Sequence, residues 1–425
     1  MVKILICMLL IFISSGMVTG MSGKLSPSSS IPIFPWDMKK LSIPPSYTWQ
    51  DPNGPIRSLI YEGPLYKGKP TKVFAYYATP GTLSQYPSKD HDLPAIVLLH
   101  GGGGTTYKEW VELWAKRGYA AIAMDLQGGQ PDGMDIPGTW KLETNHPNKA
   151  HLADGGPRND ANTFDNIDEP ITDQWPYQAV SNVISDILAH SLLLSFKEVD
   201  KNKTAITGIS WGGYLTCIVA GIDNRFKAAI PVYGSGYIYE SSFRPTFDKM
   251  TAQQKDKWIS LWEPSIYLGA TEMPVFFVNG TNDATYWLES YARTYDLVKG
   301  KRNLRITPGM VHSHKCGWEP NEIGIFVNQY LNNGVPLPFI KKPKTDNGMI
   351  KAKVVSMTKL VKAEICYTLD MLPHKERQWL SISAEISGNK IIAQALPVEA
   401  RIWFITVTDE RGAIVSSELI WPHGK

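Results

Sequence analysis

A serine at position 210 stands between two glycines in the segment Gly208-Ile209-Ser210-Trp211-Gly212. A β-branched run that begins at Thr204 precedes it, and small, helix-compatible residues follow it up to Gly221. This pattern predicts a strand, a tight turn and a helix. Glycines are expected at the flanking positions because side chains there would clash. Such a turn raises the serine hydroxyl above the edge of a sheet, where a neighbouring base can activate it as a nucleophile.

A carboxylate and an imidazole that suit this serine follow later in the chain. Asp283 comes shortly after one apolar run, and both His312 and His314 follow the next one. The spacing from Gly309 favours His312 as the base and leaves His314 as the alternative. The imidazole would take the proton of the Ser210 hydroxyl, and the carboxylate would orient the imidazole, which is the chemistry of acyl transfer.

A glycine-rich loop adds a further chemical feature. The segment His100-Gly101-Gly102-Gly103-Gly104 ends an early apolar run. Backbone N–H groups in such a loop can donate to the negative oxygen that forms when a nucleophile attacks a carbonyl. We assign one donor to Trp211, the residue after the serine, and the second to either Gly102 or Gly103. His100 is interpreted as a structural residue that holds the loop.

The chain order Ser210, Asp283, His312, together with the glycine loop, resembles the α/β-hydrolase superfamily. The resemblance covers roughly residues 60–335. It implies an α/β fold with a doubly wound, mainly parallel sheet. The triad and the backbone donors supply the whole of the expected chemistry, so we predict no cofactor and no metal, and activity that survives EDTA.

Within that superfamily the chain resembles secreted bacterial carbohydrate esterases, of the acetyl xylan esterase-like and dienelactone hydrolase-like kinds. The segments that carry the resemblance are residues 100–125, 173–177, 208–221 and 279–283. Such proteins remove acetyl or methyl esters from plant or algal polysaccharides. The resemblance therefore implies that the partner of this chain is a polysaccharide or oligosaccharide ester.

Three functions remain open at this point. The first is an esterase that removes acetyl groups, with a pectin-type methyl esterase as its close alternative. The second is a serine peptidase of the prolyl oligopeptidase type, although the Pro-rich lead-in over residues 21–58 is too short to form the usual propeller or large N-terminal domain. The third is a non-catalytic glycan-binding protein, against which the intact triad argues.

A long insertion follows the strand expected to end at Asp125. It runs over residues 126–173 and is rich in Gly, Asp and Asn. It is expected at the carboxyl edge of the sheet, where ligands bind in open α/β folds. Its carboxylates lack an EF-hand pattern, so they predict no metal site. The candidate substrate-binding residues are Trp140, Arg158, Tyr286 and Trp318. The alternative for Trp140 and Arg158 is a solvated surface loop, and the alternative for Tyr286 and Trp318 is ordinary core packing.

The first twenty residues predict a secretory signal peptide. Lys3 precedes an apolar run over residues 4–13, and small residues continue to Gly20. The run is too short for a membrane span, and no later run is long and apolar enough to form one. Cys7 lies inside the run, so no cysteine stands at lipoprotein spacing. We expect a protein that is secreted or periplasmic.

Composition excludes some other classes of protein. A formal net charge of +3 is too mild to indicate nucleic-acid binding. Cys217, Cys316 and Cys366 follow the predicted cleavage site, an odd number without metal-site spacing, so at most one disulfide is expected. Hydrophobic content of 43% and charged content of 20% are ordinary for a globular enzyme.

The predicted organisation has two folded parts. Residues 21–58 form a Ser/Pro-rich lead-in that is expected to wrap the surface, and residues 59–338 form the catalytic domain. After a linker rich in Pro and Lys, residues 346–425 contain several short apolar runs that predict a small β-sandwich. All the proposed catalytic groups precede Lys315, so this accessory domain is expected to serve stability or polymer binding rather than chemistry.

Overall fold

The computed structural model describes residues 36–102, 104–131, 149–156, 167–170, 180–422 and 424. The predicted signal peptide over residues 1–20 lies outside these residues, as do Gly103, Trp140 and Arg158. In the described part of the chain, no helix has both the length and the apolar character that a bilayer span requires.

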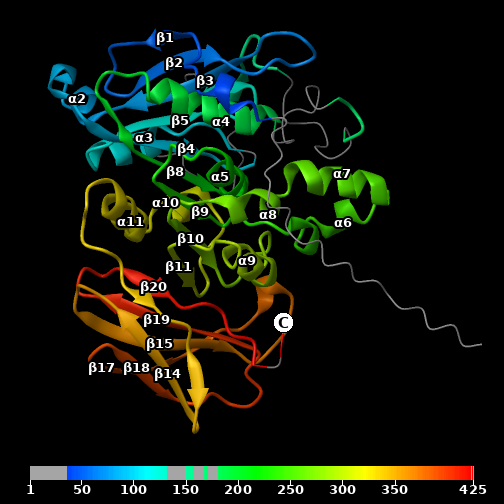
Figure 1. The fold of residues 1–425 in the computed structure, drawn as a ribbon, viewed down its shortest axis with the longest axis vertical. Helices are drawn as coiled ribbons and strands as arrows, with labels where there is room; N and C mark the ends of the chain where they lie inside the picture. Colours follow the sequence, from blue (N-terminus) through cyan, green and yellow to red (C-terminus); the bar gives the residue numbers. More distant parts are fainter. Residues whose placement is uncertain are drawn as a thin grey trace, which may run out of the picture.

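One long mixed sheet runs through the molecule, with strands in the order β1-β2-β3-β5-β4-β8-β9-β10-β11-β20-β19-β15-β16 (Figure 1). Its first part comprises β1 (Tyr47–Asp51), β2 (Arg57–Glu62), β3 (Lys72–Ala78), β5 (Ala120–Met124), β4 (Leu93–Leu99), β8 (Val199–Ile209), β9 (Ala228–Val232), β10 (Val275–Gly280) and β11 (Arg302–Thr307). The strands from β5 to β11 run parallel to one another, whereas β1, β2 and β3 are antiparallel to their neighbours.

The central strands are apolar and buried on both faces. Every residue of β5, β9 and β10 is buried, as are the last five residues of β4. Helices cover both faces of the sheet, so side chains that point either way must be apolar. The predicted α/β fold with a mainly parallel sheet is confirmed.

Helices α3 (Lys108–Lys116) and α11 (Asn321–Leu331) lie side by side on one face, where the Arg117 guanidinium packs beside Gly324. On the other face α4 (Val180–Leu193), α5 (Trp211–Ile222) and α8 (Pro264–Tyr267) pack together (Figure 1). The other described helices are α1 (Met38–Leu41), α2 (Pro80–Leu83), α6 (Arg244–Phe247), α7 (Ala252–Trp262), α9 (Leu288–Tyr295) and α10 (His314–Trp318), with single 3₁₀ turns η1 (Pro87–Lys89), η3 (Ile238–Glu240), η4 (Leu268–Ala270) and η5 (His374–Glu376).

The lead-in contributes to the sheet instead of only wrapping it. Residues 36–58 include α1, β1 and the start of β2, and β1 pairs with β2 at the edge of the sheet. The rings of Tyr47 and Trp49 both pack on Phe196, which follows α4. These aromatic contacts stabilise the segment as an edge strand of the sheet.

The insertion after Asp125 is described only in part. Its described residues form a small hairpin, in which β6 (Gly129–Pro131) pairs with β7 (Lys149–His151). The Asp125 carboxylate holds the start of the insertion, because it accepts hydrogen bonds from the backbone N–H groups of Gln127 and Gly129, both at 2.9 Å.

The C-terminal region is antiparallel and forms two layers (Figure 1). In the first layer, β15 (Leu360–Thr368), β16 (Leu380–Ser383), β19 (Ile402–Asp409) and β20 (Ile414–Ser416) extend the long sheet. The second layer contains β12 (Phe339–Ile340), β13 (Lys344–Asp346), β14 (Met349–Val355), β17 (Glu385–Ser387) and β18 (Lys390–Gln394). A tight turn joins β19 to β20, with Gly412 at a positive φ of 78°.

The sandwich is joined to the central sheet by hydrogen bonds. β20 pairs antiparallel with β11, and Leu304 lies opposite Ser416. The Ser416 hydroxyl extends this short ladder, since it accepts from the Ile306 N–H at 2.8 Å and donates to the Ile306 carbonyl at 3.1 Å. The region expected to be a separate accessory unit therefore shares a sheet with the predicted catalytic strands.

Candidate active site

Ser210 occupies a sharp turn between β8 and α5. Its backbone has φ 58° and ψ −114°, a region that residues other than glycine rarely adopt. A Cβ added to Gly208 would lie 2.1 Å from the carbonyl oxygen of Gly212, and one added to Gly212 would lie 2.1 Å from that of Leu99. The turn therefore requires both flanking glycines, and it presents the serine at the carboxyl end of β8.

His312 lies between Ser210 and Asp283. Its Nε2 is 2.9 Å from the Ser210 Oγ, and its Nδ1 is 2.7 Å from the Asp283 Oδ2. A carboxylate can only accept, so Nδ1–H donates to Asp283 and Nε2 is left to accept the Ser210 proton. The His312 side chain is 28% exposed and that of Asp283 only 1%, which places the imidazole between solvent and a buried carboxylate.

The loop after β10 orients Asp283. Its Oδ1 accepts hydrogen bonds from the backbone N–H groups of Thr285 at 2.7 Å and Tyr286 at 2.9 Å. One carboxylate oxygen is thus held by the loop itself, and the other points at His312. This local turn explains why an aspartate directly after a strand can serve as a rigid partner for an imidazole.

Tyr233 supports the imidazole and was missed by the sequence analysis. Its ring stacks on that of His312, with centroids 4.4 Å apart, and its hydroxyl donates to the Val311 carbonyl at 2.7 Å. It directly follows β9 with a positive φ of 61°. The available signal was its position, an aromatic residue at the carboxyl end of a predicted parallel strand.

His314 contacts the glycine loop instead of the serine. Its Nε2 accepts a hydrogen bond from the Gly101 N–H at 2.9 Å, and its ring packs on Tyr107 with centroids 4.8 Å apart. A Cβ on Gly104 would lie 2.9 Å from the same Nε2, so the loop can approach this ring only because it is made of glycine. The geometry brings His312, not His314, to Ser210 and Asp283.

His100 is buried, and its ring contacts the glycine loop and the start of the insertion. Its Nδ1 lies 2.7 Å from the Gly101 carbonyl oxygen, and its Nε2 accepts from the Leu126 N–H at 2.9 Å. A carbonyl accepts and an N–H donates, so these partners require the neutral ring with its proton on Nδ1. Gly102 lies in this loop, and Trp211 is the first residue of α5.

The predicted substrate-binding residues differ in their surroundings. Tyr286 is only 1% exposed, and its ring lies parallel to that of His312 with centroids 6.3 Å apart. Trp318, on α10, is partly exposed and stacks on Trp110 with centroids 5.6 Å apart. Tyr286 is thus buried beside the His312 imidazole, whereas part of the Trp318 side chain is exposed to solvent. Trp140 and Arg158 lie outside the described residues.

A second hydroxyl–imidazole–carboxylate array lies elsewhere in the fold. His190 Nδ1 is 2.8 Å from the Asp223 carboxylate, and its Nε2 is 3.0 Å from the Thr204 hydroxyl. All three residues have no exposed surface, and burial lowers the pKa of His190. No substrate can reach this array, so access to solvent distinguishes the Ser210 array from a purely structural one.

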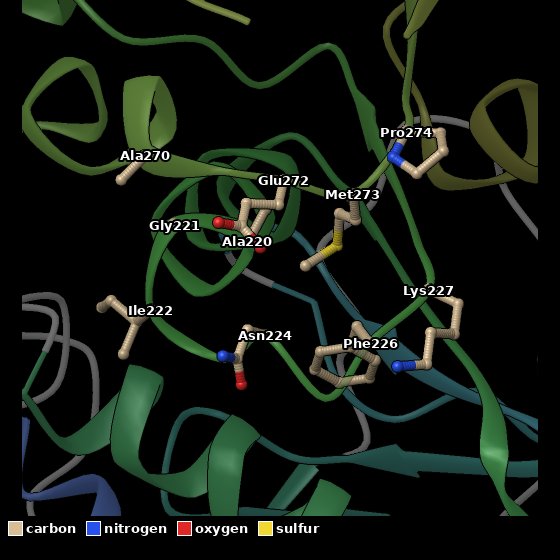
Figure 2. A pocket seen from close by; sticks show the side chains of 10 residues that line it. All are labelled: Ala220, Gly221, Ile222, Asn224, Phe226, Lys227, Ala270, Glu272, Met273 and Pro274. Atoms are coloured by element: carbon tan, nitrogen blue, oxygen red, sulfur yellow. The ribbon is translucent and has the colours of Figure 1, made fainter. Parts of the chain in front are cut away.

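A surface cavity of about 430 Å³ lies at the far end of α5 from Ser210 (Figure 2). Its lining includes Ala220, Gly221 and Ile222 at the end of that helix, and Ala270 and residues 272–274 before β10. Ser210 precedes the helix and this cavity adjoins its last residues, so the two are about 15–18 Å apart. The cavity is therefore separate from the candidate site.

Metal-binding groups are not gathered within the described residues, where no cluster of three His, Cys, Asp or Glu side chains could hold an ion. Cys217, Cys316 and Cys366 are free thiols. Cys217 is buried in α5, and burial raises its pKa, which disfavours the reactive thiolate.

Comparison with known proteins identifies the class. The model of the dienelactone hydrolase family matches residues 81–315, more than half of the 425-residue chain. The chain therefore belongs to the dienelactone hydrolase family, whose fold is that of the α/β-hydrolases.

Solved structures agree with this fold. An acetyl xylan esterase from a Paenibacillus species is 22% identical, with a TM-score of 0.53, over 72% of this chain and 96% of that one. Acetyl xylan esterase 1 from a Thermoanaerobacterium species is 13% identical, with a TM-score of 0.50, over 70% of this chain and 94% of that one. At these identities the likeness concerns the fold.

Proposed function

We propose that this protein is a secreted serine esterase that removes ester groups, with acetyl as the leading candidate, from polysaccharides or oligosaccharides. The observation that carries the proposal is the continuous array from the Ser210 hydroxyl through His312 to Asp283, at 2.9 and 2.7 Å, on a strained turn that solvent can reach. The sequence resemblance to carbohydrate esterases supplies the substrate class, and residues 1–20 supply the expectation of export.

The proposed reaction has two acyl-transfer steps. His312 Nε2 takes the proton of the Ser210 hydroxyl as Oγ attacks the ester carbonyl carbon, and Asp283 stabilises the imidazolium that results. Backbone N–H groups of Trp211 and of Gly102 or Gly103 hold the oxyanion. The imidazolium of His312 gives its proton to the leaving sugar oxygen, so the sugar departs as an alcohol. The acyl group stays on Ser210. Water, activated by the same imidazole, then releases the acid and restores the hydroxyl.

A substrate panel tests this proposal. Purified enzyme and its Ser210→Ala variant should be compared on p-nitrophenyl acetate, acetylated xylan, methylated pectin and a proline p-nitroanilide. We expect the wild type to hydrolyse the two acetyl esters faster than the other two substrates, and the variant to be inactive. Faster demethylation of pectin would make the protein a methyl esterase, and faster cleavage of the anilide would make it a peptidase.

A further inference from the structure

The loop that carries Asp283 is held by the C-terminal region. We call residues 281–287, between β10 and α9, the acid loop, and residues 369–379, between β15 and β16, the clamp loop. Asn282, directly before Asp283, extends its side-chain amide into the clamp loop. Its Nδ2 donates to the Arg377 carbonyl at 2.8 Å and approaches the carbonyls of His374 and Lys375 at 3.3 Å.

An ion pair lies just after the acid loop, with the Glu289 side chain 33% exposed. Glu289, in the first turn of α9, accepts from Arg377 Nη2 at 2.9 Å and pairs with His374 Nε2 at 2.7 Å. The Arg377 side chain is only 3% exposed. Burial alone would raise the pKa of Glu289, but the His374 hydrogen bond and the charges of Arg377 and His374 lower it to about 2. Glu289 is therefore ionised where it pairs with Arg377 and His374.

Stacking and a backbone contact complete the arrangement. The Trp287 ring, at the end of the acid loop, stacks on His374 with centroids 4.4 Å apart. Arg377 also donates from Nε to the Leu372 carbonyl at 3.1 Å, which closes the clamp loop on itself. Asn282 and Trp287 of the acid loop, and Glu289 just after it, thus all contact the clamp loop, so these contacts lie on both sides of Asp283.

We propose that the clamp loop is a positioning element for catalysis, and that Arg377 acts through Glu289 and Asn282 to hold Asp283 at its distance from His312. This inference rests on the proposed function of the triad. A misplacement of about 1 Å in a catalytic group can cost about 100-fold in rate, so a clamp on the acid loop affects the rate of acyl transfer. In this proposal, residues 369–379 position a catalytic residue and do not serve only stability or polymer binding.

The test separates positioning from stability by using matched variants of the full chain. Arg377→Ala removes the ion pair, and Asn282→Ala removes the amide donors together with the Oδ1 that accepts from the Thr281 hydroxyl at 2.7 Å. The control for Arg377→Ala is Arg411→Ala, which removes an Asp409 ion pair and hydrogen bonds to the carbonyls of Val335 and Pro336. The control for Asn282→Ala is Asn303→Ala, which removes a side-chain hydrogen bond to the Pro338 carbonyl at 2.9 Å. Neither control residue contacts the acid loop in the described hydrogen bonds.

Two rates should be measured on folded protein, with the folded fraction determined by thermal melting. For p-nitrophenyl acetate we expect both clamp variants to lose about 10- to 100-fold in kcat, with KM within about twofold, and the controls to stay within about twofold in kcat. Arg377→Lys should recover part of the rate, because an ammonium group can still pair with Glu289. Equal kcat values in the clamp variants and their controls would overturn the proposal.

The second rate is labelling of Ser210 by a fluorophosphonate, which needs the triad but no particular ester. We expect it to fall in parallel with kcat in the clamp variants. If the wild type labels but hydrolyses no ester in the panel, the proposed function fails and the labelling rates still decide the role of the clamp. If the wild type does not label at all, both proposals fail. If Arg377→Ala does not fold, Asn282→Ala decides.

Discussion

At the scale of single residues, accessibility separates the two hydroxyl–imidazole–carboxylate arrays of this protein. Thr204, His190 and Asp223 are as close to one another as Ser210, His312 and Asp283 are, yet the first set is sealed in the core. Ser210 differs because its turn forces a positive φ and places the hydroxyl beyond the end of its strand. Strained backbone at a polar residue that is not sealed in the core is typical of a functional position.

Replacement of Ser210 should abolish activity and preserve the fold. Ser210→Ala removes one hydroxyl at a turn, so little packing is lost, and we expect kcat for p-nitrophenyl acetate to fall by about 10⁴-fold or more. Thr204→Val is the matched control, because it removes the hydroxyl of the buried array on the same strand. It should lower the melting temperature and leave kcat within about twofold. A Ser210→Ala variant that retains a tenth of the wild-type kcat would exclude Ser210 as the nucleophile.

The two neighbouring histidines should differ in their effect. His312→Ala removes the imidazole that contacts both Ser210 and Asp283, so the loss in kcat should approach that of Ser210→Ala. His314→Ala removes the acceptor of the Gly101 N–H and loosens the glycine loop, which should cost about 10- to 100-fold, less than loss of a whole oxyanion donor. Steady-state kinetics on one ester compares them, and the opposite order of severity would make His314 the base.

At the scale of elements, one buried carboxylate organises the loop after β9. Glu263 caps α8, where it accepts from the Ser265 N–H at 3.2 Å, and it also accepts from the N–H groups of Tyr237 and Ile238. This loop passes the start of α5 so closely that a Cβ on Gly234 would lie 2.1 Å from the Tyr214 nitrogen. Glu263 therefore helps to hold the elements around the nucleophile turn.

The pH dependence of stability should report on Glu263. Burial raises its pKa from the ordinary 4.5 to about 7. Between these values the folded state binds more protons than the unfolded state, so this group makes the free energy of unfolding fall as the pH rises from about 4.5 to about 7. Above pH 7 its contribution is constant.

Glu263→Gln should remove this component. The amide keeps one acceptor oxygen for the backbone donors and does not ionise. Urea unfolding at intervals from pH 5 to pH 8 should give a wild-type free energy that falls relative to the variant by an amount on the order of a few kcal/mol. The exposed Glu272, replaced in the same way, serves as the control. Parallel curves for the wild type and Glu263→Gln would show that burial does not raise this pKa.

At the scale of the whole molecule, the seam between the central sheet and the C-terminal region is narrow. Leu304 and Ser416 form its backbone pair, and the Ser416 hydroxyl supplies two further hydrogen bonds to Ile306. An ion pair between Arg302 and Glu418 lies beside it. The clamp loop contacts the acid loop elsewhere, so the two regions are joined at more than one place.

Loss of the Ser416 hydroxyl should weaken this seam. Ser416→Ala leaves the buried Ile306 N–H without its acceptor, and we expect the free energy of unfolding to fall by about 1–3 kcal/mol. Ser387→Ala removes an exposed hydroxyl from β17 and should change it by less than about 0.5 kcal/mol. Equilibrium unfolding in urea compares the two, and equal values would mean that the hydroxyl does not contribute to the seam.

Several features could be predicted from the sequence because their causes are local. The turn around Ser210 needs glycines on both sides for steric reasons, and those glycines are adjacent in the chain. Buried parallel strands are continuous apolar runs, so residues 95–99 and 120–124 could be recognised without any partner. The order of the nucleophile, acid and base along the chain indicated the fold because α/β-hydrolases carry them in this order.

Only the tertiary structure decided the rest, because it depends on contacts between distant segments. Spacing in the sequence favours His312 but leaves His314 open, and only the folded chain shows which ring reaches Ser210 and which reaches Gly101. Pairing of β20 with β11 depends on which sheet edge is open, which no local pattern encodes. Nothing in the sequence indicated a role for Arg377, because its partner Glu289 lies far away along the chain. Steric constraints and hydropathy patterns depend on neighbouring residues, so the sequence determines them directly. The distances between side chains and the pairing of sheet edges depend on distant residues, so they are set only when the chain has folded.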